Sequence, residues 1–552
     1  MRKNGFTVIV NKDTYNCRVI TNYINKFLDD KVSYEDSSLL IVFDGVLINK
    51  GDLLKHPNDK LCDWFIKSYR AFGDGFFSSL RGSFSGVIVD KEKRQILAFS
   101  DQLGSKFVFF SQTKSDVIVS TMMSEIYNFY KEENIPYSLS AENAYLLLTY
   151  GYMVEERTLC SSIFKIKPGY YLRIDEKNIA CQIQYFELNI NQQEISEDEA
   201  IEIIDAAFRE AVIRAFNKDV EYGYRHLVAL SAGLDSRMTS WVAHELGYTD
   251  QTNFTFSQTN YYDQLIPQDI IKDLKHDWIF KPLDNGLWLY NVDDITELTG
   301  GNVLYYGLSH SYNLYKDINF DNFGIIHSGQ LGDVILGSKY SDESKKLKYE
   351  IGTGAYSKRF IDRIKDLRLG DYPNQEIAWF ALRGFSGTNN GLMCEYSFSE
   401  TLSPFMDLDF MNICFSIPNS MRIEHNLYKK WILKKYPEAA NYPWETIKAK
   451  ITEPTLRLRG ENIPLSQIIP RVSAKALKKV HIIKDTGNGM NPIEKYLSDN
   501  SELYDYLMSY RRYLNRIPEE KLANDVNMLL NQGKAVEKIQ AISLLAALKL
   551  FY

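Results

Sequence analysis

Residues 226–246 constrain the fold more strongly than any other stretch of the chain. An apolar run from His226 to Leu230 leads into the turn Ser231-Ala232-Gly233-Leu234-Asp235-Ser236, and a helix-like run begins at Arg237. A buried strand, a tight turn and a helix N-terminus together form an anion site, because the first N–H groups of a helix have no partner inside it. The small residues of the turn let the backbone approach a phosphate closely. Asp235 cannot bind phosphate, but its carboxylate can hold the Mg²⁺ that accompanies phosphate groups.

Further apolar strands are expected after this turn, with helix-length spacers between them. The expected strands are residues 226–230, 252–257, 278–281 and 324–328, and the chain after about residue 340 has a mainly helical pattern. Alternating strands and helices predict an α/β domain with a parallel, doubly wound sheet, whose ligands bind at the carboxyl ends of the strands. The segment Ser328-Gly329-Gln330-Leu331-Gly332-Asp333 follows the last of these strands. We therefore expect Asp333 to meet Asp235 there and to share one Mg²⁺.

Residues 1–190 have a different pattern, which is rich in short β-strands. Strands are expected at residues 7–10, 39–43, 83–89, 96–100, 108–111, 117–120 and 170–174, and helices at residues 60–72 and 141–150. Turn residues between the apolar runs indicate hairpins. A polar linker covers residues 187–198, and Ser196 to Glu199 fits a helix capping box. We therefore divide the chain into an N-terminal domain, residues 1–190, and a second domain, residues 191–552.

The composition argues against several classes of function. A chain of 552 residues, 45% hydrophobic and 24% charged, has the balance of a globular protein with more than one core. A net charge of -7 argues against nucleic-acid binding. The six cysteines form no C-x-x-C pair, and the eight histidines lack metal-ligand spacing. No apolar stretch is long enough to predict a membrane span, so we expect a cytoplasmic protein.

Several short sequence motifs of the chain resemble motifs of the asparagine synthetase superfamily. Ser231 to Ser236 resembles the S-G-G-x-D-S pyrophosphate loop of ATP-pyrophosphatases, with Ala232 in place of a glycine. Residues 328–333 resemble the phrase S-G-x-G-x-D, with Leu331 at the second glycine position. Residues 80–90, 100–110 and 158–169 resemble phrases of the asparagine synthetase N-terminal domain. The resemblance covers most of residues 38–454, and the superfamily also includes β-lactam synthetases and lasso-peptide cyclases.

The resemblance implies that the N-terminal domain is an α+β sandwich of the N-terminal-nucleophile glutaminase type. In that family a cysteine at residue 1 attacks glutamine and releases ammonia, with a base beside the thiol. Here residues 2–5 are Arg-Lys-Asn-Gly, the first cysteine is Cys17, and Asp44-Gly45-Val46 stands in place of the N-G-E glutamine loop. We therefore expect a degenerate glutaminase-like domain that keeps the fold without the activity.

The resemblance also implies a site for ATP and Mg²⁺ in the second domain. Asp235 and Asp333 would hold the metal ion. Glu400 would act as general base when the amine attacks, and Lys448 would stabilise charge as the adenylate collapses. Lys430 would lie near pyrophosphate. The expected contacts to ATP are Ser231, Ala232, Gly233, Leu234, Asp235, Ser236, Phe256, Ser328, Gly329 and Lys430.

Three of these residues have a plain structural alternative. Glu400 could be a glutamate on a surface loop, Lys448 could be a solvated loop lysine with Lys450 as its competitor, and Lys430 could lie on a helix surface. The sequence alone leaves these alternatives open.

The expected function is that of an ATP-dependent carbon–nitrogen ligase. It would adenylate a small-molecule or peptide carboxylate, release pyrophosphate, and let an amine or ammonia displace AMP, with proximity as a main source of rate. The setting would be natural-product or surface-glycan biosynthesis. Three alternatives stay open: a non-catalytic ATP-binding scaffold, an asparagine synthetase that uses free ammonia, and a tRNA-modifying ATP-pyrophosphatase. The sequence leaves open whether the chain forms a homodimer.

Overall fold

The N-terminal part of the chain contains two antiparallel sheets. The computed structural model describes residues 4–552 apart from residues 57, 338–349, 459–460, 469 and 471–488. The first sheet has the order β2-β1-β8-β7-β9, with β2 at Cys17–Asn22, β1 at Gly5–Asn11, β8 at Asp116–Ser120, β7 at Phe109–Gln112 and β9 at Phe164–Lys165. The second has the order β11-β10-β6-β5-β4-β3, with β11 at Ala180–Gln184, β10 at Tyr170–Ile174, β6 at Gln95–Ser100, β5 at Gly82–Asp90, β4 at Leu39–Leu47 and β3 at Val32–Glu35.

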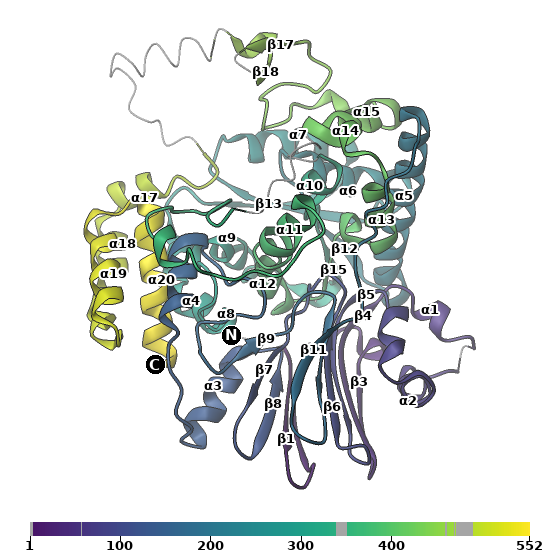
Figure 1. Ribbon diagram of the computed structural model, residues 1–552. Coiled ribbons are helices and arrows are strands. Elements are labelled where there is room, and N and C mark those ends of the chain that lie inside the picture. Colours follow the sequence, from purple (N-terminus) through teal and green to yellow (C-terminus); the bar gives the residue numbers. More distant parts are fainter. Residues whose placement is uncertain (1–3, 57, 338–349, 459–460, 469, 471–488) are drawn as a thin grey trace.

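The two antiparallel sheets pack face to face and carry helices on their outer faces (Figure 1). Alternate residues of the strands point inward, so Val8 and Val119 of the first sheet share a core with Val87 and Leu172 of the second. Helix α2 (Leu61–Phe72) covers the six-stranded sheet, and α3 (Met123–Glu132) and α4 (Ala141–Tyr150) cover the other. These four layers confirm an α+β sandwich.

Every strand and helix expected before residue 190 is present, and the structure also contains several elements that were not expected. The sequence reasoning missed β2, β3, β9, β11 and helices α1 (Lys50–Leu53) and α3. The outer strand β2 has no fully buried residue, and β11 is also partly exposed. Edge strands of this kind show no clear alternation between apolar and polar residues, so the pattern gave no signal.

Helix α5 (Glu197–Tyr222) begins the second half of the chain, as the capping motif predicted. Ser196 Oγ accepts a hydrogen bond from the Glu199 N–H at 3.3 Å, and Glu199 Oε2 accepts one from the Ser196 N–H at 3.1 Å. The inward face of the helix is buried, as its 3.6-residue period indicated; this face consists of Ile201, Ile204, Phe208, Val212 and Ala215.

A parallel sheet forms the centre of the second half. Its order is β14-β13-β12-β15-β16, with β14 at Asp277–Pro282, β13 at Gln251–Ser257, β12 at Arg225–Ala229, β15 at Phe323–His327 and β16 at Thr401–Leu402. Each pair of neighbours is parallel. The four strands expected from the sequence are present, whereas the short edge strand β16 was not expected. Since Leu227 enters one core and Val228 the other, the centre of β12 is buried on both faces, and the sequence is apolar from Leu227 to Leu230.

Helices cover both faces of the parallel sheet, as doubly wound topology requires. One face packs against α5, α6 (Leu234–Glu245), α7 (Tyr262–Leu274), α13 (Leu408–Ser416) and α15 (Asn426–Lys435). The other packs against α8 (Val292–Thr299), α9 (Tyr306–Tyr315) and α20 (Ala535–Phe551). The remaining elements are α10 (Gly332–Leu336), α11 (Gln375–Trp379), α12 (Leu392–Tyr396), α14 (Asn419–Arg422), α17 (Ile493–Asp499), α18 (Ser501–Met508), α19 (Glu520–Gln532), and strands β17 (Thr455–Leu458) and β18 (Glu461–Pro464).

The C-terminal helix α20 joins the two halves of the molecule. It packs against α4 of the N-terminal half and against α8. The ring of Phe551 stacks on Tyr127 with centroids 4.4 Å apart. Figure 1 shows α20 running beside α4 at the edge of the molecule. Over the described ranges, no helix has both the length and the apolar content needed to cross a bilayer.

Candidate functional site

The turn between β12 and α6 forms the first part of the site. Gly233 is the N-cap of α6, and no side chain caps this helix. Ser236 Oγ accepts a hydrogen bond from the Ser231 N–H at 2.9 Å and lies 2.9 Å from Ser231 Oγ, so the turn is held by its own hydroxyl groups. With no side-chain cap, the N-terminus of α6 can receive an anion.

The second loop, residues 328–333, lies against this turn because β12 and β15 are neighbours in the sheet. The Asp333 N–H donates a hydrogen bond to Asp235 Oδ2 at 2.8 Å. Glycines make the approach close, since a Cβ on Gly329 would lie 2.4 Å from the Asp235 carbonyl carbon and one on Gly332 would lie 2.7 Å from Asp235 Cγ. The structure thus brings Asp235 and Asp333 together at the carboxyl ends of two strands.

The carboxylates of this pair fit a divalent cation. Burial, followed by the charge of Asp333, raises the pKa of Asp235 well above its ordinary value. The Tyr428 hydroxyl donates to Asp235 Oδ1 at 2.9 Å. Arg237, the nearest cation in sequence, instead donates to backbone carbonyls at Ala439 and Tyr442. Two adjacent carboxylates with open lone pairs suit Mg²⁺, which takes one or two carboxylates together with phosphate oxygens.

Leu331 shows why glycine is usual at its position in the related phrase. It has a φ of 66°, in the left-handed region. A side chain in this region costs about 1–2 kcal/mol, which glycine avoids. With leucine at this position the Asp333 N–H still contacts the Asp235 carboxylate, so the replacement of glycine by Leu331 does not separate the two aspartates.

A third segment docks on the first loop and carries Lys448. The Glu445 N–H donates to the Ala232 carbonyl at 3.3 Å, and the Ala232 N–H donates to Asp263 Oδ1 at 2.8 Å. Lys448 has a φ of 57°, and its exposed ammonium group lies 5.7 Å from the centre of the Tyr262 ring. Lys448 is therefore on the rim of the site, in a turn that contacts the loop of residues 231–236.

Two other predicted residues have partners elsewhere. Lys430 Nζ lies 2.5 Å from Glu197 Oε2, and both side chains are more than 40% exposed, at 43% and 42%. This is the helix-surface alternative that the sequence left open. Phe256, in β13, stacks on His310 with ring centroids 4.6 Å apart and is half-buried.

A cavity of about 400 Å³ opens beside Asp333. Its walls are Leu331, Asp333, Val334, Gly354, Trp379, Phe380, Arg383, Gly384 and Thr388. This volume is in the usual range for small-molecule pockets, and its lining is mainly apolar with a few polar groups, as such pockets require. The sequence reasoning missed Arg383, Trp379 and Tyr428, because no phrase or period marked them.

Glu400 lies in a different environment from the one expected of a general base. Its side chain is 0% exposed and forms ion pairs with Lys31 Nζ at 3.0 Å and with Lys106 Nζ at 2.9 Å. Asp44 completes the group through Lys106 at 2.7 Å and through Lys31. We call these four residues, Lys31, Asp44, Lys106 and Glu400, the interdomain quartet. The surface-loop alternative for Glu400 is wrong, and the quartet also disfavours a base role, because both lysines hold its carboxylate.

The quartet balances two buried positive charges against two buried negative ones. Although burial acts in the opposite direction, Asp44 and Glu400 raise the pKa of Lys31 above its ordinary value. Burial likewise opposes the charge of Asp44, yet Lys106 and Lys31 hold the pKa of Asp44 well below its usual range. Lys31 and Asp44 therefore stay charged at neutral pH. The ion pairs of the quartet tie the N-terminal half to the segment just before β16.

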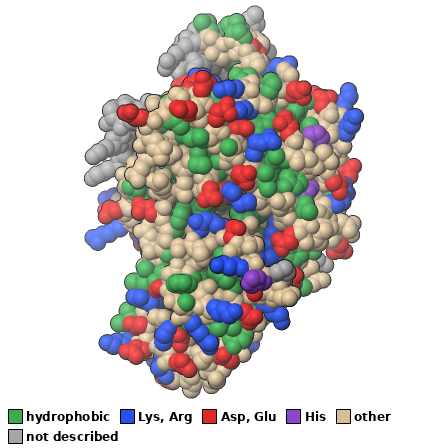
Figure 2. Space-filling model, turned by 90° about the vertical axis from the view of Figure 1, so that its right-hand side faces the viewer, with side chains coloured by type: hydrophobic (Ala, Val, Ile, Leu, Met, Phe, Trp, Pro, Cys, Tyr) green, Lys and Arg blue, Asp and Glu red, His purple; other side chains and the backbone are tan. Residues whose placement is uncertain are grey.

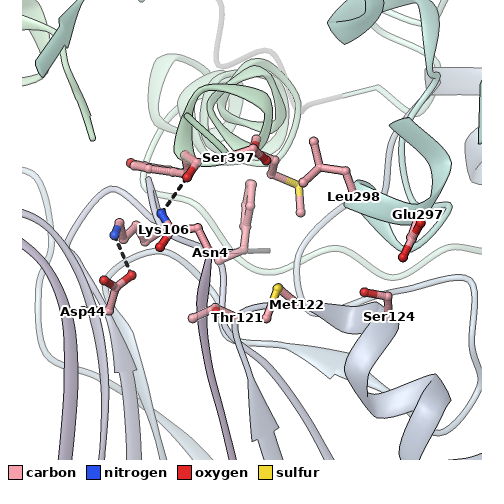
Figure 3. A pocket seen from close by; sticks show the side chains of 12 residues that line it. Asn4, Asp44, Lys106, Thr121, Met122, Ser124, Glu297, Leu298 and Ser397 are labelled. Carbon is pink, nitrogen blue, oxygen red and sulfur yellow. Dashed lines mark hydrogen bonds and ion pairs between the residues drawn. The ribbon is translucent and has the colours of Figure 1, made fainter. Parts of the chain in front are cut away.

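A second cavity borders the quartet, between the two halves of the molecule (Figure 3). Its lining includes Asn4, Asp44, Lys106 and Thr121 from the N-terminal half and Glu297 from α8. In Figure 3, Asp44 and its ion pair with a lysine lie at one end of this cavity, and Glu297 lies at the other end. In this half, burial raises the pKa of the Cys17 thiol to about 11, so that thiol is not activated. The expected change at the N-terminal nucleophile falls on residues 1–3, which lie outside the described residues.

Charges of both signs are interspersed on the surface. Figure 2 shows lysines and arginines alternating with acidic side chains across the visible face. Nucleic-acid binding usually requires a basic stripe or patch. The visible face offers none among the residues drawn in colour.

Comparison with known proteins agrees with the resemblance seen in the sequence. A family model described as a glutamine amidotransferase domain matches residues 31–186. The chain is 27% identical over 200 residues to amidase chry2 of Gibberella zeae, a match that covers 35% of the chain and 28% of the relative. It is 24% identical over 251 residues to glutamine-hydrolyzing asparagine synthetase 2 of Bacillus subtilis, covering 41% of the chain and 33% of the relative. The matches thus span about a third of each relative's length.

Among solved structures, a glutamine phosphoribosylpyrophosphate amidotransferase from Bacillus subtilis matches 50% of the chain and 84% of its own length. The identity is 10% and the TM-score is 0.24, which is too low to bear on the fold. The amidotransferase-domain model and the asparagine synthetase matches point to the same family as the two aspartate loops at the sheet edge. Over these parts of its length the chain is similar to members of the asparagine synthetase-like superfamily.

Proposed function

We propose that the chain is an AMP-forming amide synthetase that uses ATP and Mg²⁺. The observation that supports this most directly is the contact between the two predicted loops, in which the Asp333 N–H meets the Asp235 carboxylate at 2.8 Å. Two loops that lie almost a hundred residues apart meet at the edge of the sheet where such folds bind their ligands. The uncapped N-terminus of α6 adds a place for phosphate next to this pair.

Each residue of the site has a part in this proposal. Asp235 and Asp333 would hold Mg²⁺, which supplies charge compensation for the phosphates of ATP. Leu234 and Ser236, at the uncapped start of α6, would hold phosphate oxygens through backbone N–H groups, together with the hydroxyls of Ser231 and Ser236. Ala232 and Gly233 would let the phosphate come close, because they are small. Lys448, on the rim, would approach the leaving pyrophosphate or the collapsing adenylate.

The reaction follows from the chemistry of a carboxylate at neutral pH. An oxygen of the substrate carboxylate attacks the α-phosphorus of ATP, and the bond from that phosphorus to the bridging oxygen breaks as pyrophosphate leaves. The nitrogen of an amine then attacks the acyl carbon, the acyl–oxygen bond breaks, and AMP leaves with the electron pair. A proton leaves the nitrogen in this step. Holding both reactants in the cavity beside Asp333 supplies the proximity that this step needs.

The N-terminal half would act without glutamine hydrolysis. The quartet supports this proposal, because the Asp44 carboxylate in the position of the family's glutamine loop is bound by Lys31 and Lys106. Among the described residues, the Cys17 thiol has a raised pKa of about 11 and cannot supply a thiolate near neutral pH. The nitrogen would then come from free ammonia or from an amine substrate.

The test is ATP–pyrophosphate exchange with a panel of candidate acids: amino acids, sugar acids and peptides. We expect at least one acid to drive exchange, and we expect Asp235→Asn and Asp333→Asn each to abolish it. Glu245→Gln, which changes an acid at the far end of α6, is a matched control that should keep exchange. Tight ATP binding without exchange by any acid would favour a non-catalytic scaffold. Full exchange in Asp235→Asn would contradict the metal assignment.

A further inference from the structure

The cavity beside Asp333 has a cation that the proposed function has not used. Arg383 lines this cavity together with Asp333 and Trp379. Asp333 is the single acidic residue among the described lining residues, and Arg383 is the single basic one. The rest of the lining is apolar or small, apart from Thr388. The cavity therefore contains one anionic group and one cationic group within an otherwise mainly apolar lining.

Aromatic rings hold the Arg383 guanidinium in place. Its central carbon lies 5.5 Å from the centre of the Tyr152 ring and 5.6 Å from that of Tyr356. No described carboxylate forms an ion pair with it; its contacts are with these rings. Stacking on aromatic faces orients a guanidinium, and its planar N–H fork suits a planar anion at two points.

The backbone near Arg383 has an unusual helical turn, and a glycine lies in close contact with the neighbouring Trp379. Residues Phe380–Phe385 form a π-helix, an arrangement that is rare and often found at functional sites. Gly354, with a φ of 73°, lies so close to Trp379 that a Cβ would be 3.1 Å from the ring. These features keep the Trp379 ring and the Arg383 side chain along one wall of the cavity.

We propose that Arg383 binds the carboxylate of the acid substrate, and that this acid carries an aromatic or aliphatic body that packs on Trp379. If Asp333 and Asp235 hold Mg²⁺, the remaining charged group of the cavity must meet the other anionic partner. A guanidinium binds a carboxylate through two parallel hydrogen bonds, which fixes the plane of the carboxylate as well as its position. Trp379, Phe380, Leu331 and Val334 then favour an apolar body over a sugar. The inference rests on the proposed function for the identity of that partner as substrate.

Binding measurements on the full chain test the proposal without turnover. The probes are phenylacetate, its neutral analogue phenylacetamide, and acetate, each titrated calorimetrically. We expect phenylacetate to bind at least tenfold more tightly than either of the other two. Arg383→Met should remove this preference, and Arg383→Lys should keep only part of it, because an ammonium lacks the planar fork.

Controls separate this site from the nucleotide site and from a folding defect. Arg512→Met removes an exposed arginine that also stacks on a tyrosine ring, Tyr513, and should leave phenylacetate binding unchanged. The affinity of Arg383→Met for Mg·ATP should stay within twofold of the parent, and its melting temperature should show that it is folded. Equal affinity for phenylacetate and phenylacetamide in the parent would overturn the proposal. Loss of Mg·ATP binding in Arg383→Met, with phenylacetate binding intact, would assign Arg383 to phosphate instead. If the parent binds phenylacetate selectively but never binds Mg·ATP, the proposed function fails while the carboxylate site stands.

Discussion

Neutralising Glu400 should expose the role of the interdomain quartet. Glu400→Gln leaves Lys31, Lys106 and Asp44 buried with a net positive charge, because the side chains involved are at most 5% exposed. Removing one partner of a buried ion pair usually costs about 3–5 kcal/mol. If the whole chain unfolds as one cooperative unit, its unfolding entropy is roughly 2.1 cal/mol/K per residue. The loss of stability then lowers the melting temperature by about 3–4 °C.

A double-mutant cycle distinguishes an ion-pair role from a catalytic one. Lys106→Met with Glu400→Gln removes one charge of each sign and leaves the Lys31–Asp44 pair neutral overall. We expect the double variant to be more stable than the sum of the two single changes predicts, with a coupling energy of about 2 kcal/mol. Thermal unfolding of the parent, both single variants and the double variant measures this. Asp198→Asn, which breaks an exposed pair with Lys434, is the control and should leave the melting temperature unchanged.

Amide formation by the same variants gives the decisive result. If Glu400 acts through the quartet, the double variant should regain amide formation in step with its stability. Additive effects on stability would refute the argument from buried charge. A normally stable Glu400→Gln that supports ATP–pyrophosphate exchange but makes no amide would refute the structural role and restore the general base expected from the sequence.

Further predictions concern the two aspartates and the loops that carry them. The pKa of Asp235 is raised in the folded state, so its contribution to stability is present at low pH and is lost as pH rises through the folded pKa. Asp235→Asn should therefore raise the melting temperature of the Mg²⁺-free protein at pH 8, by an amount that shrinks towards pH 4, and should abolish stabilisation by added Mg²⁺; an unchanged response to Mg²⁺ would contradict this. Gly329→Ala should destabilise the chain by about 1–3 kcal/mol and weaken Mg·ATP binding, because its Cβ would lie 2.4 Å from Asp235 backbone; Gly391→Ala, with open space around the new Cβ, is the control in calorimetry. Lys448→Ala should lower exchange more than Lys430→Ala, whose side chain pairs with Glu197, and equal effects would show that the rim position is unimportant.

The local pattern of the sequence was sufficient for most of the secondary structure. Strand β12 could be predicted because its centre, at Leu227 and Val228, is buried on both faces and belongs to an apolar run that continues to Leu230. Helix α5 could be predicted because Ser196 and Glu199 satisfy the backbone groups at its N-terminus. The contact between Asp235 and Asp333 also followed from the sequence, since two strands of one parallel sheet present their carboxyl ends at the same edge.

Tertiary structure decided which charges face each other. Glu400 lies in a motif that resembles a catalytic one, yet its partners Lys31 and Lys106 come from loops hundreds of residues earlier. Arg383 belongs to no recognised motif. Its candidate role comes from its contacts with the rings of Tyr152 and Tyr356 and from its place in the cavity beside Asp333. Short-range sequence patterns show which backbone groups need hydrogen-bond partners and which faces must be buried, because apolar positions repeat with the period of a helix or strand. The partner of a buried charge has no such period, so only the folded chain identifies it.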